Sequence, residues 1–435
     1  MKPVNVGIVG LGTVGSGTFN VLCRNSEDIA RRAGREILVT HVGARRDNPN
    51  ADTAGVTVSR DIFAVAEDPS VDILVELIGG TTVARDLVMK AIQNGKHIVT
   101  ANKALIAEHG NEIFAAALAK GVNVAFEAAV AGGVPIIKAI REGLSANRID
   151  WVAGIINGTG NFILTEMAEK GRDFDDVLKE AQALGYAEAD PTFDVEGIDA
   201  AHKLTILASI AFGIPLQFSK TFTEGITKIT REDVEYAREL GYRIKHLGVT
   251  RQTEKGVELR VHPTLIPESR LIANVNGVMN AVMVQSDAVG PTLYYGPGAG
   301  SEPTASAVVA DVVDVARALT TDPNNRVPHL AFRADSLSDA PILPIEDVVT
   351  GYYLRMHVKD QPGVLAKIAA ALSDSDINIE AIIQKDQADE ASPVPLIMIV
   401  RQVVESKMNG ALDKIRALDV LADDIVRIRL ETLDG

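Results

Sequence analysis

Residues Val4 to Gly15, VNVGIVGLGTVG, decide the fold of the first part of the chain. Val4–Val9 is almost entirely aliphatic, which predicts a short buried strand. Gly10, Gly12 and Gly15 follow at the spacing G-x-G-x-x-G, and Thr13–Cys23 is expected to form a helix. A strand, a glycine turn and a helix in this order favour a dinucleotide-binding unit over a merely tight turn.

Each glycine of such a unit has its own role. Gly10 permits the tight turn, Gly12 lets the backbone approach a pyrophosphate, and Gly15 allows the helix to pack closely on the strand. The first N–H groups of the helix would face the phosphates, aided by the helix dipole. Thr13 and Val14 therefore join the three glycines as predicted cofactor-binding residues.

The residues after the second strand indicate which nicotinamide cofactor fits. Ile37–Gly43 is the predicted strand, and Arg45 and Arg46 follow it where an NAD site would carry an acidic residue. Two guanidinium groups suit a 2′-phosphate, which favours NADP and leaves NAD as the alternative. A solvated basic pair ahead of the turn Asp47–Asn50 is the structural alternative.

Strand-like and helical runs continue to alternate through this part of the chain. The predicted strands are Asp72–Ile78, Lys96–Thr100 and Val122–Phe126, and the predicted helices are Ala84–Asn94 and Ile106–Lys120. This alternation predicts a doubly wound parallel sheet of Rossmann type. Ligands bind such sheets beyond the carboxyl ends of the strands, where Gly79-Gly80, Lys103 and Glu127 are expected.

The pattern changes after Pro135. Predicted strands at Trp151–Ile156, Arg243–Thr250, Val257–His262 and Ala281–Ser286 indicate a mixed α+β sheet with helices on one face. The predicted helices of this part are Ile136–Leu144, Phe162–Lys170, Phe174–Leu184 and about Glu196–Phe212. A glycine-rich segment ending at Gly300 then leads into a helix, Thr304–Leu319, which we expect to pack back on the nucleotide domain with Gly300 close to the cofactor.

The segment GYAEADPTFDVEGIDAAHKL, from Gly185, gathers carboxylates ahead of Lys203. Asp199 and Lys203 are four residues apart on one helical face, which alone indicates an ordinary surface ion pair. Glu188, Asp190 and Asp194 precede the helix, so their charges would converge near its first turns. Such a cluster is costly unless a cation neutralises it, and a substrate carrying an ammonium group would do so. His202 is interpreted as a solvated or capping residue.

Several segments together resemble one family. They are Gly10–Gly15, Thr100–Lys103, Glu127–Pro135, Asn157–Thr159 and Gly185–Lys203. On these residues the chain resembles homoserine dehydrogenase, in the long form with a C-terminal regulatory domain. The resemblance implies reversible NAD(P)-dependent conversion of L-homoserine to L-aspartate 4-semialdehyde, a step toward threonine, methionine and isoleucine.

The resemblance also implies roles for individual residues. Lys203 and Lys103 look like the catalytic lysines, and the residues alone leave open which one moves the proton, with Lys203 favoured. Glu188 and Asp199 look like substrate ligands, Asp194 supports them, and Gly185 belongs to the same substrate-binding segment.

A cation site is implied in the same way. Glu127, Val130, Gly132 and Val134 match a monovalent-cation site, usually sodium, built from one carboxylate and backbone carbonyls. A plain strand-to-helix turn is the structural alternative for this stretch.

The C-terminal part has its own pattern. Strands at Tyr352–Val358, Ile377–Gln384, Val394–Val400 and Ile425–Leu430, with helices to about Ser373 and at Ser406–Leu418, give the order βαββαβ of a ferredoxin-like unit. The turn Asp360–Leu365 resembles that of an ACT domain, which implies an amino-acid effector, threonine as feedback inhibitor, and ligand binding across a dimer interface. A dimerisation module without a ligand is the alternative.

These observations divide the chain into parts. We expect residues 1–134, with about 300–320, to form the nucleotide-binding domain, 135–299 the catalytic and dimerisation domain, 321–349 a linker, and 350–435 the ACT domain. A chain of 435 residues fits two or three such units.

Composition excludes several classes of partner. A net charge of -15 argues against nucleic acid and anionic membrane surfaces. Neither a long apolar run nor a signal-like N-terminus is present, and a single cysteine suits a reducing cytoplasm. We therefore expect a cytoplasmic homo-oligomer, a dimer or a tetramer.

Two alternative functions compete with this interpretation, and the first of them fails. An acylating semialdehyde dehydrogenase needs a thiol beside the nicotinamide, and Cys23 is predicted to lie in the first helix, away from that position. A non-catalytic amino-acid sensor built from the nucleotide-binding and ACT modules would not need the cluster from Glu188 to Lys203.

Overall fold

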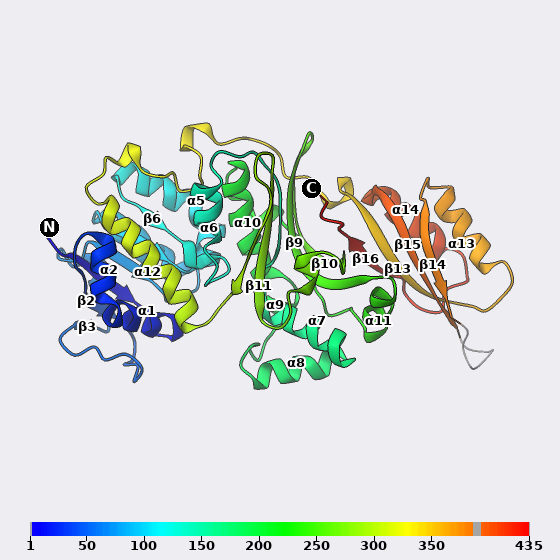
Figure 1. Ribbon diagram of the computed structural model, residues 1–435, viewed down its shortest axis with the longest axis horizontal. Helices are drawn as coiled ribbons and strands as arrows, with labels where there is room; N and C mark the ends of the chain where they lie inside the picture. Colours follow the sequence, from blue (N-terminus) through cyan, green and yellow to red (C-terminus); the bar gives the residue numbers. More distant parts are fainter. Residues whose placement is uncertain (1, 386–392, 435) are drawn as a thin grey trace.

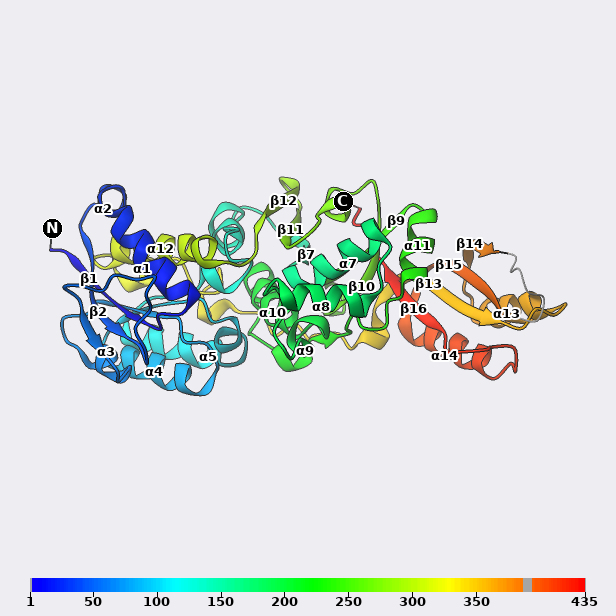
Figure 2. The ribbon, with the colours of Figure 1, turned by 90° about the horizontal axis from the view of Figure 1, so that it is seen from below.

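A computed structural model describes residues 2–385 and 393–434 of the chain. The two predicted α/β parts and the C-terminal part follow one another along the long axis of an elongated molecule (Figures 1 and 2). The N-terminus lies at one end of this axis. The C-terminus returns to the middle, where Leu433 is buried among residues of the central sheet.

The first sheet is entirely parallel, with the strand order β3-β2-β1-β4-β5-β6. Its strands are β1 (Val4–Val9), β2 (Ile37–Gly43), β3 (Thr57–Ser59), β4 (Ile73–Glu76), β5 (His97–Thr100) and β6 (Val124–Ala125). Its helices are α1 (Thr13–Arg24), α2 (Ser26–Ala33), α3 (Phe63–Glu67), α4 (Thr82–Gln93), α5 (Lys103–Lys120) and α12 (Ser301–Ala318). The doubly wound Rossmann-type sheet is thus confirmed.

Helices cover both faces of this sheet, as its continuous aliphatic strands require. Helices α1, α2 and α12 share one hydrophobic cluster with Val6 and Ile8, whereas α3, α4 and α5 share another with Leu74 and Ile98. Helix α12 packs beside α1 although some 280 residues separate them, as expected from the sequence. It begins at Ser301, about one turn earlier than predicted, because Pro303 is tolerated in the first turn of a helix.

A second sheet of ten strands runs through the middle and C-terminal parts, with the order β12-β11-β7-β9-β10-β16-β13-β15-β14 and β8 beside β10. The strands before residue 300 are β7 (Ile149–Ile155), β8 (Phe222–Thr223), β9 (Tyr242–Thr253), β10 (Gly256–Pro267), β11 (Met279–Ser286) and β12 (Gly290–Pro297). The later strands are β13 (Val349–Val358), β14 (Ile379–Gln384), β15 (Val394–Val404) and β16 (Val426–Leu430). Strand β12 was not predicted, because its prolines and glycines are typical of turns and are tolerated only in an edge strand like this one.

The helices outside the first sheet lie around this second sheet. They are α6 (Ile136–Lys138), α7 (Gly158–Lys170), α8 (Phe174–Ala183), α9 (Thr192–Val195), α10 (Ile198–Phe212), α11 (Arg231–Glu239), α13 (Val364–Ser373) and α14 (Glu405–Arg416). Short helical turns are η1 (Glu127–Ala129), η2 (Ala139–Gly143, a π-helix), η3 (Phe218–Lys220), η4 (Leu271–Asn274), η5 (Pro323–Asn325), η6 (Ala334–Ser336) and η7 (Ile345–Asp347). The last three lie in the segment that the sequence predicted to be a linker, and the predicted domain boundaries stay predictions.

The C-terminal βαββαβ unit is confirmed, but its sheet is not separate from the central one. Strand β16 pairs in parallel with β10, with Thr264 opposite Arg429 and Leu265 opposite Leu430. The helices change faces across this junction. Helices α7 and α11 cover one face of the sheet, while α13 and α14 pack on the face that carries Tyr352, Leu354 and Met356.

Buried ion pairs tie the two halves of the second sheet together. Arg429 of β16 is 1% exposed, and its guanidinium donates to Glu405 of α14 at 2.8 Å and to Glu224, beside β8, at 2.7 Å. Arg260 of β10 is equally buried and contacts Glu258 and Glu431. Because these charges lie away from water, each depends on its partner for compensation.

Replacing Glu405 with Gln should therefore destabilise the C-terminal part strongly. The buried Arg429 would lose its carboxylate, and breaking such a pair typically costs about 3–5 kcal/mol. Glu380→Gln, on the exposed face of β14, is the matched control. Urea unfolding followed by far-UV circular dichroism measures both variants. Equal midpoints for the two would show that the buried pair contributes little.

Candidate active site

The candidate site lies where the first sheet meets the middle part of the chain. A cavity of about 500 Å³ opens there, beyond the carboxyl ends of β4 and β5. Its walls include Gly79, Gly80 and Lys103 from the first sheet, and Phe193 and His202 from the middle part. Ligands of open parallel sheets bind at this position, and the cavity lies beside Gly79, Gly80 and Lys103, where the sequence predicted a ligand.

A buried carboxylate joins the two predicted catalytic lysines. Asp199 is 4% exposed and lies in the first turn of α10. Its Oδ2 accepts from the Nζ of Lys203 at 2.6 Å, and its Oδ1 lies 3.0 Å from the Nζ of Lys103. Lys203 also donates to the carbonyl oxygen of Ile156 at 2.7 Å. The pair between Asp199 and Lys203 is thus a buried contact and not the surface ion pair that helix statistics favour.

Asn157 completes this cluster from a different helix. It caps the N-terminus of α7, where its Oδ1 accepts from the backbone N–H of Gly160 at 2.7 Å. Its Nδ2 donates to Asp199 at 2.9 Å and to Asp194 at 2.7 Å. Asn157 belongs to a segment that carried the family resemblance but had no predicted role, and the helix predicted from Phe162 already begins at Gly158. An Asn directly before a helix start is the signal that could have identified the cap.

The three charged groups shift one another's pKa values. Burial disfavours the ionised form of Asp199, yet Lys203, Lys103 and Asn157 outweigh it and hold the pKa of this carboxyl well below its usual range. Burial lowers the pKa of Lys203 below its ordinary value, against the opposing effect of Asp199. Asp199 raises the pKa of Lys103. The two lysines are therefore shifted in opposite directions.

The other carboxylates of the acid-rich segment differ in how close they come to this cluster. Asp194 faces it, and burial raises its pKa. Glu188 is exposed, close enough to contribute to the raised pKa of Lys103. Asp190 instead accepts from the hydroxyl and N–H of Thr192, and Glu196 accepts from Thr227. The expectation that Glu188, Asp190 and Asp194 would converge near the first turns of the helix is thus wrong for Asp190, because its carboxylate binds Thr192 within its own loop.

His202 is not the solvated residue that the sequence suggested. It is 2% exposed, and its ring stacks on Phe218 at 4.0 Å between centroids, with Phe193 at 5.5 Å. Its Nε2 lies 3.2 Å from Glu108 of α5, so this pair links α10 to the first sheet. The apolar positions on both sides of His202 in α10 could have indicated its burial. Gly185 ends α8 in a left-handed conformation, with φ +75°, and is exposed.

The glycine turn has the geometry that a pyrophosphate requires. A Cβ on Gly15 would lie 1.8 Å from the carbonyl oxygen of Gly10, so only glycine fits where the helix crosses the strand. A Cβ on Gly12 would meet open space, where a phosphate could approach the backbone. The hydroxyl of Ser301, next to Gly300, donates to the carbonyl oxygen of Thr13 at 2.8 Å. Helix α12 therefore starts beside the glycine turn, as expected from the sequence.

Arg45 and Arg46 are exposed just beyond the end of β2. The N–H of Gly10 donates to the carbonyl of Gly43 at 2.8 Å, and the side chain of Asn48 donates to Leu11 at 2.6 Å. Both contacts hold the segment that carries the arginines next to the glycine turn. Cys23 is exposed in the last turn of α1 and does not line the site cavity.

The predicted cation site is built around a buried turn. Glu127 is 2% exposed, and its carboxylate accepts from the backbone N–H groups of Ile137 and Lys138 at 2.9 and 2.8 Å. Burial, and then the charge of Asp311, raise the pKa of Glu127 to about 7. In the described part of the chain, no donor contacts the carbonyl oxygens of Val130 and Gly132. The carbonyl of Val134 accepts from Ile136.

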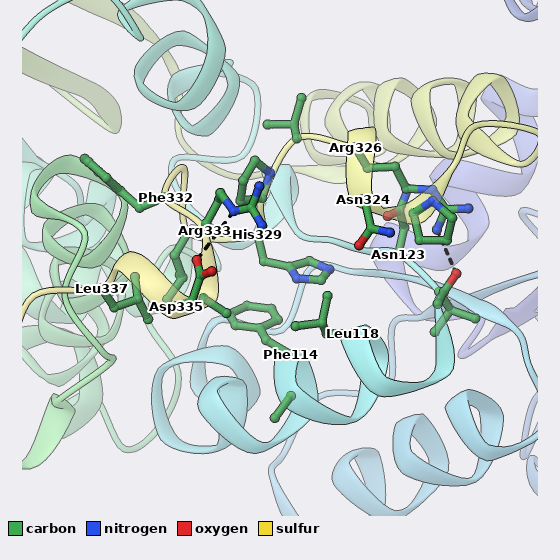
Figure 3. Close-up of a pocket in the computed structure, with 18 of the residues that line it drawn as sticks. Phe114, Leu118, Asn123, Asn324, Arg326, His329, Phe332, Arg333, Asp335 and Leu337 are labelled. Carbon is green, nitrogen blue, oxygen red and sulfur yellow. Dashed lines mark hydrogen bonds and ion pairs between the residues drawn. The ribbon is translucent and has the colours of Figure 1, made fainter.

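A larger cavity lies elsewhere, between α5 and the segment from Pro323 to Leu337 (Figure 3). Its volume is about 810 Å³, and its walls include Phe114, Leu118 and Phe332. His329 lies against Phe114 in a parallel stack and accepts from the N–H of Val124 at 3.2 Å, so its ring is a structural element of the wall. None of the residues lining this cavity belongs to the lysine cluster, so it does not compete as the site of chemistry.

No helix within residues 2–385 and 393–434 combines the length and the apolar character that a bilayer span needs.

Comparisons with known proteins agree with the geometry. The family model described as homoserine dehydrogenase, NAD binding domain, matches residues 10–127. The models described as homoserine dehydrogenase and as ACT domain match residues 135–313 and 352–419.

Individual relatives span the whole chain. A homoserine dehydrogenase of Pseudomonas aeruginosa is 69% identical over 100% of both chains. The crystal structure of a homoserine dehydrogenase from Thiobacillus denitrificans is 64% identical, covers 100% of this chain and 99% of its own, and superposes with a TM-score of 0.95. A hyperthermophilic archaeal homoserine dehydrogenase in complex with NADPH is 26% identical, covers 72% of this chain and 98% of its own, and has a TM-score of 0.62. On this geometry and these matches, the chain belongs to the homoserine dehydrogenase family and is an oxidoreductase with a nicotinamide-nucleotide domain, a catalytic domain and an ACT domain.

Proposed function

We propose that the chain interconverts L-homoserine and L-aspartate 4-semialdehyde, a step toward threonine, methionine and isoleucine. The observation that carries the proposal is the pair of lysines held by Asp199 at the mouth of the nucleotide crevice. The nicotinamide cofactor supplies or accepts the hydride when bound. The protein's own contribution is to orient the substrate and to move one proton.

Lys203 is the proposed proton-transfer group. Oxidation of the alcohol requires a neutral amine to take the hydroxyl proton, and reduction requires an ammonium to return it. Burial lowers the pKa of Lys203, which favours the neutral form needed for oxidation. Asp199 raises the pKa of Lys103, which therefore remains a cation suited to stabilise the developing alkoxide.

The acidic side chains are proposed to hold the amino group of the substrate. Glu188 and Asp199 remain the proposed ligands, with Asp194 in support and Gly185 in the same segment. Asp194 is half-buried beside Asp199, and burial raises its pKa. An ammonium group placed between these carboxylates would supply a positive charge beside Asp194 and favour its ionised form.

NADP is the proposed cofactor. Arg45 and Arg46 lie where a 2′-phosphate would meet two guanidinium groups, and an archaeal relative has been solved with NADPH. The ratio of kcat/KM for the two cofactors tests this choice, and a ratio in favour of NAD contradicts it.

A sodium ion is proposed at Glu127. One carboxylate and the free carbonyls of Val130 and Gly132 offer the hard oxygen ligands that such a cation prefers. A cation would also favour ionisation of Glu127, whose pKa is raised to about 7. If exchange of sodium for choline at constant ionic strength leaves activity unchanged, the proposal fails.

A cytoplasmic homo-oligomer is proposed for the assembled protein. Within the described residues, η4 and Leu433 complete the hydrophobic cluster on one face of the central sheet, and Leu271 of η4, Tyr295 of β12 and Val289 are exposed. A second copy packed there would remove this apolar surface from water. Sedimentation that shows a monomer at micromolar concentration would rule it out.

Threonine is the proposed effector at the ACT domain, and a chain of contacts leads from that domain to the site. Arg429 of β16 binds Glu224, and two residues further on the N–H of Ile226 donates to the carbonyl of Val195 at 2.9 Å. Val195 ends α9, the helix that carries Asp194. A movement of β16 would therefore displace Asp194, which contacts Asn157 and through it Asp199.

Lys203→Met should abolish most of the turnover while leaving NADPH binding intact. Loss of a positioned acid–base group typically lowers kcat by roughly 10²–10⁴-fold. Absorbance of the reduced nicotinamide measures turnover, and fluorescence titration measures binding. Lys179→Met, on the exposed side of α8, is the control and should keep wild-type rates. An unchanged rate for Lys203→Met would remove its catalytic role, and a wild-type protein inert toward homoserine would favour the amino-acid sensor.

Asp199→Asn should move the pH profile of homoserine oxidation toward acid. The Asp199 anion stabilises the ammonium forms of both lysines, so its removal lowers their pKa values and the neutral base forms at lower pH. We expect the rising limb of kcat to shift down by roughly one pH unit or more. A limb that stays in place, or that moves to higher pH, would contradict the assignment of a lysine as the base.

Glu224→Gln should weaken inhibition by threonine. The neutral amide would loosen the contact with Arg429, and the half-inhibiting threonine concentration should rise by about 10-fold, within the usual range of allosteric coupling. Glu235 forms an exposed ion pair with Arg231 on α11, so Glu235→Gln should leave the half-inhibiting threonine concentration unchanged. Equal sensitivity of both variants would disprove this route, and a wild-type enzyme indifferent to threonine would disprove the effector.

A further inference from the structure

A second buried carboxylate lies beneath the site and takes no part in the proposed reaction. Glu76 is the last residue of β4 and is fully buried, with 0% exposure. The strand residues before it are aliphatic, and the two glycines that line the site cavity come shortly after it. A fully buried carboxylate is costly unless donors surround it, so its partners define what it does.

The donors to Glu76 come from two separate loops. Its Oε1 accepts from the backbone N–H of Ile78 at 2.9 Å and from that of Gly79 at 3.3 Å. Its Oε2 accepts from the hydroxyl of Thr100, at the end of β5, at 2.6 Å. The hydroxyl oxygen of Thr100 in turn accepts from the backbone N–H of Asn102 at 3.0 Å, so its proton is directed to Glu76.

Asn102 closes these bonds into a ring. Its side-chain Nδ2 donates to the carbonyl of Gly80 at 2.7 Å, and its Oδ1 caps α5 by accepting from the N–H of Leu105 at 3.1 Å. The ring therefore runs from Glu76 through Thr100 and Asn102 to Gly80 and back along the chain. Gly80 and its neighbour Gly79 have φ values of 72° and 70°, a left-handed conformation that favours glycine.

Lys103 directly follows the capping Asn102 and is the first residue of α5. The ring thus fixes both the glycine loop of the cavity and the start of the helix that carries a lysine bound to Asp199. Every described contact to the carboxylate of Glu76 is a donor, which is the set that an ionised carboxylate needs. Burial raises the pKa of Glu76, and these donors oppose that effect.

We propose that Glu76 is a positioning residue of the active site. Through Thr100 and Asn102 it fixes the position of the Gly79-Gly80 loop relative to Lys103. This inference rests on the proposed function for its kinetic consequences only. A displacement of about 1 Å at a reacting group can lower a rate by roughly 100-fold, so a residue that touches neither substrate nor cofactor can still control turnover.

Glu76→Gln tests this proposal with nearly unchanged volume. One end of the new amide can still accept from Ile78 and Gly79, but its NH₂ group would face the hydroxyl of Thr100 and donate where Glu76 accepts. We expect kcat per NADPH-binding site to fall by roughly 10- to 100-fold. The Kd for NADPH should change by less than about 3-fold, because no described hydrogen bond joins residues 10–15 to Glu76, Thr100 or Asn102. A merely structural residue would lower the number of active sites and leave kcat per site unchanged.

Variants of Thr100 keep the test decisive if Glu76→Gln folds poorly. Thr100→Val removes the hydroxyl link and should reproduce the loss of kcat, whereas Thr100→Ser keeps the hydroxyl and should restore it. Glu76→Gln and Thr100→Val break the same link. The double variant should therefore lose little more kcat than either single variant. Fully additive losses would show that the two residues act separately and would overturn the proposal.

Hydrogen exchange gives a readout that does not depend on the substrate. In Glu76→Gln, amides of residues 78–80 and 102–105 should exchange at least several-fold faster, while those of residues 10–15 stay unchanged. Unchanged exchange in both loops would refute the ring even if the enzyme loses activity. If the wild-type protein does not oxidise homoserine but Glu76→Gln shows this faster exchange, the proposed function is refuted and the positioning role stands.

Discussion

The site depends on one buried carboxylate that two lysines share. Asp199 is almost inaccessible to water, and an isolated charge there would be strongly unfavourable. Lys203, Lys103 and Asn157 compensate it from three different helices. Helix geometry assists this arrangement. Asp199 lies in the first turn of α10, where the dipole favours an anion, whereas Lys103 lies in the first turn of α5, where a cation needs such a partner.

This arrangement requires the two α/β parts to face each other closely. Helix α12 contributes by returning from the end of the middle part to cover the first sheet, where Ser301 contacts the glycine turn. On the other side, the central sheet continues into the ACT domain through β10 and β16. The C-terminal domain is therefore part of the same sheet that supports α10, and hydrogen bonds from Arg429 to Glu224 and from Ile226 to Val195 connect it to the helix that carries Asp194.

Much of this structure could be predicted from local sequence patterns. Strand β2 has the predicted limits, and the glycine spacing at Gly10 identified the nucleotide fold because each glycine meets a steric requirement of the turn. The start of α5 at Lys103 was missed, although Asn102 directly before it is the same local capping signal as Asn157 before α7. The pairing of β10 with β16 was also missed. These strands lie about 160 residues apart, and no local periodicity specifies which distant edges meet.

A structure of the chain with NADP and L-homoserine bound would test the central claim most directly. The account predicts that the substrate hydroxyl lies within hydrogen-bonding distance of the Nζ of Lys203 or Lys103, with Asp199 still joining the two lysines. The amino group of the substrate should face Glu188, Asp194 and Asp199. Substrate bound in the cavity beside Phe114, or lysines separated from Asp199 in the ternary complex, would contradict it.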